Sequence, residues 1–62
     1  MKVGLYDKVL LKSGETAYIV EIHKQDVDYE ADIDRREGYS ETVPISHQDI
    51  DSVLHKAVGV TF

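Results

Sequence analysis

Residues 28–34, DYEADID, alternate charged and apolar side chains at every step. Successive side chains of a β-strand point to opposite faces of a sheet, whereas a helix repeats its apolar positions every three or four residues. The alternation therefore predicts a strand with one face in the core and one in water. The inner face carries Tyr29, Ala31 and Ile33, and the acidic outer face carries Asp28, Glu30, Asp32 and Asp34.

Residues 26–37 also nearly match the pattern of a calcium-binding loop, with acids at five alternating positions and Glu37 at the end. Such a loop turns sharply at its sixth position, which calls for glycine, but this chain has Ala31 there. The preceding residues are rich in β-branched types, whereas a calcium loop of this kind needs a helix on each side. We therefore expect a strand with a solvated acidic face, and neither a metal site nor another cofactor.

Other segments carry the β-branched and aromatic residues of strands and are separated by turn-forming residues. We expect strands over residues 8–12, 16–24, 39–46 and 51–54, and a 3-10 turn over residues 46–50 that is capped by Ser46. Gly14 is placed to adopt a positive φ in the first turn. Pro44 cannot donate a hydrogen bond to a neighbouring strand, so its strand lies at an edge or turns the proline away from its partner.

The segment 16–24 is expected to be the central strand, but its alternation fails at Ile19-Val20. Either both faces are partly covered or a bulge shifts the register. The expected core adds Val9, Leu11, Val20 and Ile22 to the inner face of residues 28–34. At least two of the four tyrosines are also expected in the core.

The chain has 62 residues and no cysteine, so one small apolar core or a partner must supply its stability. Residues 55–62 are expected to form a C-terminal strand or arm, and a homodimer through this arm is one arrangement that the sequence allows. The N-terminal residues lack the apolar run of a secretory signal, and no segment is apolar enough to span a membrane, so a cytoplasmic location is expected.

A resemblance to small SH3-like β-barrels covers residues 5–54. The most specific part of this resemblance is the opening segment, which is similar to that of short bacterial barrels and of KOW-type domains. It consists of Asp7-x-Val9-x-Leu11, a turn at Gly14 and the run Ile19-Val20-Glu21-Ile22. The resemblance implies one all-β domain over residues 1–62, with five strands, a core over about residues 5–54 and a 3-10 turn before the last core strand.

Charge and motifs exclude several functions. Twelve acids against seven bases give a formal net charge of -5, which disfavours generic binding to nucleic acid. The chain has no nucleophile motif and no P-loop, and the spacing of His23, His47 and His55 matches no short zinc motif, so no catalytic residues are expected. SH3 domains that bind proline-rich peptides carry A-L-Y-D-Y and a tryptophan. This chain keeps Leu5-Tyr6-Asp7 and has no tryptophan.

The expected function is a non-catalytic module that binds another protein. Exposed tyrosines are common binding hot spots, and Tyr6 or Tyr39 is the best candidate, together with the acidic outer face of Asp28, Glu30, Asp32 and Asp34. The alternative is association with nucleic acid through a local basic patch, or mimicry of nucleic acid by the acidic strand. The patch would consist of Lys8, Lys12, Arg35 and Arg36.

Overall fold

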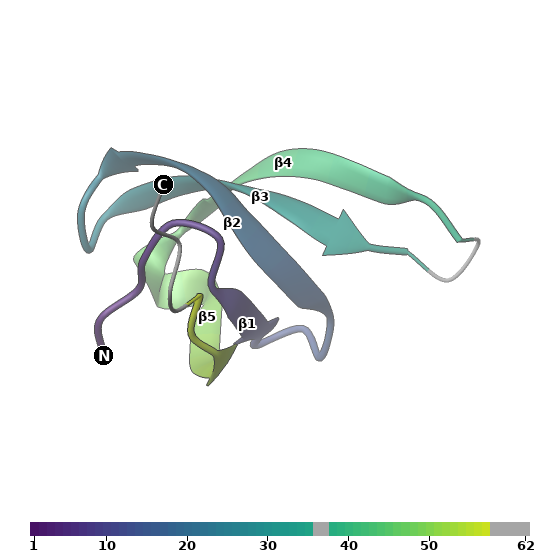
Figure 1. Ribbon diagram of the computed structural model, residues 1–62, viewed down its shortest axis with the longest axis horizontal. Helices are drawn as coiled ribbons and strands as arrows, with labels where there is room; N and C mark the ends of the chain where they lie inside the picture. The colour runs from purple at the N-terminus through teal and green to yellow at the C-terminus, as the bar shows by residue number, and fades with distance from the viewer. Residues whose placement is uncertain (36–37, 58–62) are drawn as a thin grey trace.

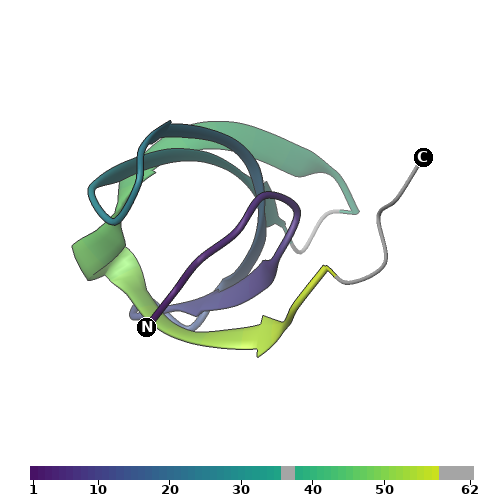
Figure 2. The ribbon, with the colours of Figure 1, turned by 60° about the vertical axis from the view of Figure 1, so that its left-hand side comes forward.

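The computed structural model describes residues 1–35 and 38–57, which form one five-stranded antiparallel sheet (Figure 1). The elements are β1 (Lys8–Leu11), β2 (Thr16–Lys24), β3 (Asp28–Asp34), β4 (Ser40–Ser46), the 3-10 turn η1 (His47–Asp49) and β5 (Ile50–His55). The strand order is β4-β3-β2-β1-β5, and the sheet curls around a common interior (Figure 2). The predicted all-β fold with a 3-10 turn before the last strand is confirmed. Among the described residues no ladder joins β4 to β5, so the sheet is not closed into a complete barrel.

The pairing of β2 with β3 explains the break in alternation at Ile19-Val20. Ala17 lies opposite Ile33 and Ile19 opposite Ala31, but the register shifts between Ile19 and Glu21. A bulge at Val20 therefore turns both Ile19 and Ile22 toward the interior. The prediction that Val20 faces the core is wrong, because the fully buried residue is its neighbour Ile19.

The core agrees with the remaining inner positions that the sequence predicts. It consists of Val3, Val9, Leu11, Ala17, Ile19, Tyr29, Ala31, Ile33, Ile45 and Ile50, with Ile22 packed against it. Val3 lies outside the predicted core range of residues 5–54. The prediction of two or more buried tyrosines is wrong, since only Tyr29 is buried while Tyr6, Tyr18 and Tyr39 are about half exposed.

The hydroxyl of Tyr29 joins the turn between β2 and β3 to η1. It accepts a hydrogen bond from the Asp26 N–H at 3.1 Å and lies 2.7 Å from Nδ1 of His47. The His47 N–H in turn donates to the Val27 carbonyl at 2.9 Å. Burial raises the pKa of the Tyr29 hydroxyl, so the group keeps its proton to a higher pH than an exposed tyrosine does. Residues 26–34 therefore form a short turn and a strand, which is incompatible with a calcium loop over the same residues.

Strand β4 lies at one end of the sheet order, which is one of the two arrangements that Pro44 allowed. Ser46 occupies the predicted N-cap position of η1, and the Asp49 carboxylate accepts hydrogen bonds from both the N–H and the hydroxyl of Ser46. Strand β5 extends to His55, so the predicted arm of residues 55–62 begins inside the sheet. Residues 58–62 of this arm lie outside the described part of the chain.

Over residues 1–35 and 38–57, no helix has the length and apolarity needed to cross a membrane.

Candidate functional site

A tight turn over residues 4–7, here called the Tyr6 turn, precedes β1. The Asp7 N–H donates to the Gly4 carbonyl at 3.2 Å, and Tyr6, the third residue of the turn, has a φ of 67°. Type II turns require a positive φ at this position and therefore favour glycine there. A bulky L-residue in the left-handed region costs roughly 1–2 kcal/mol. The chain thus places a tyrosine where its backbone is strained.

The strain at Tyr6 is not offset by burial of its ring. The residue is 53% exposed, and it is not part of the core. Asp26 is the other described non-glycine residue with a positive φ, but a short polar side chain that bonds locally tolerates this conformation. Within residues 1–35 and 38–57, the Tyr6 side chain forms no comparable local hydrogen bond, so the surrounding structure must hold the residue in place.

Strand β2 holds one side of the Tyr6 turn. The Tyr6 N–H donates to the Ile19 carbonyl at 2.6 Å, and the Ile19 N–H donates to the Asp7 carbonyl at 3.0 Å. Two residues of the N-terminal segment therefore oppose one residue of β2, as in a β-bulge. Because Ile19 is fully buried, the turn is attached to a fixed part of the sheet.

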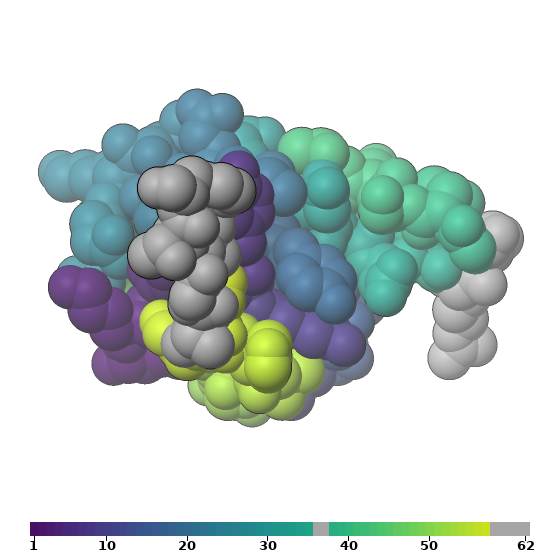
Figure 3. Space-filling model, viewed as in Figure 1, coloured from purple at the N-terminus to yellow at the C-terminus, as the bar shows by residue number. Residues whose placement is uncertain are grey.

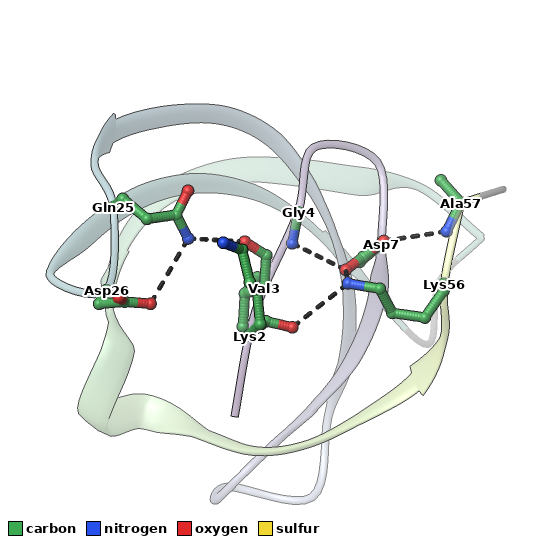
Figure 4. A network of polar contacts seen from close by, with 8 residues as sticks. All are labelled: Lys2, Val3, Gly4, Asp7, Gln25, Asp26, Lys56 and Ala57. Carbon is green, nitrogen blue, oxygen red and sulfur yellow. Dashed lines mark hydrogen bonds and ion pairs between the residues drawn. The ribbon is translucent and has the colours of Figure 1, made fainter. Parts of the chain in front are cut away.

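The carboxylate of Asp7 holds the other side of the turn, although only 1% of this residue is exposed. Its Oδ2 accepts hydrogen bonds from the Gly4 N–H at 2.7 Å and from Nζ of Lys56 at 2.6 Å, and its Oδ1 accepts one from the Ala57 N–H at 2.9 Å (Figure 4). We call Gly4, Asp7, Lys56 and Ala57 the Asp7 clasp. It joins the C-terminal end of the described chain to the Tyr6 turn.

The charge state of Asp7 follows from its partners. Burial alone would raise the pKa of the carboxyl group, but the hydrogen bonds from Lys56, Ala57 and Gly4 together outweigh burial and lower the pKa. Asp7 is therefore ionised at neutral pH. A buried carboxylate with charged and backbone donors is costly to separate from them, so the clasp restrains the turn strongly.

Two further contacts fix the residues that lead into the turn. Nζ of Lys56 also donates to the Lys2 carbonyl at 3.2 Å, and Nε2 of Gln25 donates to the Val3 carbonyl at 2.8 Å (Figure 4). The Val3 side chain is itself fully buried. The Tyr6 turn is thus held before, within and after its strained residue, and its exposed ring is presented on a rigid support.

Tyr39 is exposed, as expected, but it lies far from the Tyr6 turn. It immediately precedes β4, and its carbonyl accepts a hydrogen bond from the Arg35 N–H at 2.9 Å. Strands β3 and β4 extend away from the body of the molecule at this end (Figure 3). The structure therefore does not bring Tyr6 and Tyr39 into one site.

The acidic residues of β3 lie on the outer face, with Asp28 and Asp34 exposed and Glu30 and Asp32 half-buried. The two half-buried acids have polar neighbours. Nε2 of His23 lies 3.1 Å from the Glu30 carboxylate, and the Thr42 hydroxyl donates to the Asp32 carboxylate. Within the described residues, no group of three or more acidic or histidine side chains is arranged to hold a metal ion.

Two of the basic residues that could form a patch, Arg35 and Lys8, contact other side chains of the chain. Arg35 pairs with Glu15 at 2.5 Å and with Glu41 at 3.0 Å. Nζ of Lys8 lies 5.8 Å from the centre of the Tyr18 ring, a cation–π geometry. Arg36 lies outside the described residues.

Comparison of the chain with models of protein families, with curated proteins and with solved structures finds no match. The candidate site therefore rests on the residues themselves. The role of Asp7 was missed in the sequence, although a signal is present: Asp7 has the same parity as Val9 and Leu11, which places a carboxylate at an inward position. Its partner Lys56 is 49 residues away and leaves no local signal.

Proposed function

We propose that this chain is a non-catalytic protein-interaction module with a small SH3-like barrel fold, and that it binds another protein through the Tyr6 turn. The observation that carries the proposal is the strained backbone of Tyr6 combined with the exposure of its ring. Strained residues persist where the surrounding structure holds them, and they cluster at binding and catalytic sites.

A tyrosine in this setting suits binding for two physical reasons. Its ring offers apolar area and its hydroxyl offers a hydrogen bond, which is why tyrosine is frequent among binding hot spots. The Asp7 clasp and β2 already fix the backbone that carries the ring, so little conformational entropy is lost when a partner binds. The strand order and the position of η1 are compatible with a small barrel of this type.

The proposal predicts that Tyr6→Gly abolishes partner capture while leaving the fold intact, because the substitution removes the side chain and glycine accepts a positive φ. The measurement is quantitative affinity capture from a lysate of the native host, with the immobilised wild-type chain and each variant. The matched control is Tyr39→Ala, which removes a tyrosine that is equally exposed but unstrained.

We expect the wild type and Tyr39→Ala to retain the same specific protein, and Tyr6→Gly to lose it. If Tyr6→Gly retains every protein that the wild type retains, the Tyr6 turn is not the binding site. If only Tyr39→Ala loses the partner, the site lies at the β3–β4 end of the sheet.

Association with nucleic acid has weaker support. The two ion pairs of Arg35 reduce the charge that it can offer to a phosphate group. The acids of β3 give the outer face a negative character that would repel nucleic acid, although it would suit mimicry of nucleic acid toward a basic protein. The Tyr6 turn remains the better-supported site, because it combines strain, exposure and a rigid support.

A further inference from the structure

A row of side chains crosses the outer face of the sheet perpendicular to the strands. Asp32 of β3 lies opposite Tyr18 of β2, Tyr18 lies opposite Lys8 of β1, and Lys8 lies opposite His55 of β5. Tyr18 is 46% exposed, although Nζ of Lys8 lies over its ring. We call Asp32, Tyr18, Lys8 and His55 the cross-strand row.

The cross-strand row has an acidic end, an apolar centre and a basic end. Asp32 and Lys8 each lie one strand away from Tyr18, at a spacing of about 4.8 Å between neighbouring strands. The register shift between Lys8 and Val9 leaves Leu54 as an extra residue beside Lys8, and Leu54 is 49% exposed. Apolar surface therefore lies between and beside the two opposite charges.

This arrangement is self-complementary under a two-fold rotation. If the axis runs parallel to β2 through Tyr18, a second copy presents the same row in reverse order. When the ammonium group of each Lys8 moves from the Tyr18 ring of its own copy, it faces the partner's Asp32, and the two Tyr18 rings meet at the centre. Self-complementarity of a single surface is the requirement for the symmetric interface of a homodimer.

We propose that two copies of this chain associate through the cross-strand row. Each copy carries a formal net charge of -5, so two copies repel one another overall. Association therefore requires local pairing of opposite charges, and the row supplies two such pairs around an aromatic contact. The inference is independent of the Tyr6 turn and uses a different set of side chains.

The test is sedimentation velocity over a series of protein concentrations, with folding of each variant checked by circular dichroism. We expect a concentration-dependent dimer for the wild type. Lys8→Glu and Asp32→Lys should each raise the dimer dissociation constant by about tenfold or more, because each places like charges opposite one another. The dissociation constant of the double variant should return to within about threefold of the wild-type value. The double variant exchanges the positions of the positive and the negative charge, so the row stays self-complementary.

The single variants also separate local pairing from overall charge. Asp32→Lys changes the formal net charge from -5 to -3, which weakens overall repulsion, yet we expect it to weaken the dimer. Tyr18→Ser should also weaken the dimer, whereas Tyr39→Ser and Tyr6→Gly should not. Loss of partner capture in Tyr6→Gly and loss of self-association are therefore measured separately.

Two results would overturn the proposal. One is a wild type that stays monomeric at every concentration, and the other is a double variant that dimerises as weakly as the single variants.

Discussion

Replacement of Ile33 by aspartate is expected to unfold the domain. Ile33 is 5% exposed, belongs to the core and lies opposite the buried Ala17. Placing a carboxylate there without a partner costs several kcal/mol. A domain of this size has a total stability of only a few kcal/mol, at roughly 0.05–0.15 kcal/mol per residue. Circular dichroism and a one-dimensional proton spectrum of Ile33→Asp should show an unfolded chain.

The neighbouring residue provides the control for this prediction. Asp32→Asn lies on the opposite face of β3, and its amide oxygen can still accept the hydrogen bond from Thr42. We expect the free energy of unfolding to change by no more than about 0.5 kcal/mol. A folded Ile33→Asp variant together with an unfolded Asp32→Asn variant would show that the two faces of β3 are assigned the wrong way round.

Replacement of Asp7 by asparagine is expected to lower the free energy of unfolding at pH 7 by about 3 kcal/mol. Asparagine has nearly the same shape, but its NH₂ group cannot accept a hydrogen bond, so one donor of the Asp7 clasp loses its acceptor. The substitution also removes the negative charge that pairs with the Lys56 ammonium group. Chemical denaturation measures the effect. Asp28→Asn, which neutralises an exposed carboxylate of β3, is the matched control and should change stability little.

The contribution of Asp7 to stability should depend on pH in a defined direction. The pKa of Asp7 is lowered in the folded state, so its contribution is fully present above the unfolded pKa of about 3.9. It is lost as the pH falls through the folded pKa. The difference in stability between the wild type and Asp7→Asn should therefore be largest near neutral pH and shrink below about pH 4. A difference that stays constant down to pH 2 would show that the ionised form is not the one that the clasp stabilises.

The strands were predictable because their determinants are local. The alternation of residues 28–34 predicts both β3 and its inner face, since the period of two follows from backbone geometry alone. The sequence of residues 19–20 was compatible either with a bulge or with a strand that is partly covered on both faces. Only the pairing of β2 with β3 shows that the bulge is present. The buried tyrosines were overestimated because aromatic residues were assigned to the core by parity, while the interior of so small a sheet holds only Tyr29.

The candidate site could be predicted only in part. The exposure of Tyr6 and Tyr39 agrees with the sequence analysis, and their role in binding stays a prediction. The positive φ of Tyr6 was not predictable, because tyrosine does not favour it and the contacts that impose it come from Ile19 and from Lys56 beyond β5. Long-range contacts of this kind leave no local pattern in the sequence.

The central claim is that the fold holds Tyr6 in a strained left-handed conformation while its ring stays exposed. The most direct test compares the free energies of unfolding of Tyr6→Gly and Tyr6→Ala by urea denaturation. Both variants remove the ring, and they differ in whether the residue tolerates a positive φ. The structure predicts that Tyr6→Gly is the more stable of the two by about 1 kcal/mol, because alanine retains the left-handed strain and glycine does not. If Tyr6→Ala is as stable as Tyr6→Gly or more stable, residue 6 is not held in a strained conformation, and the account of the site is contradicted.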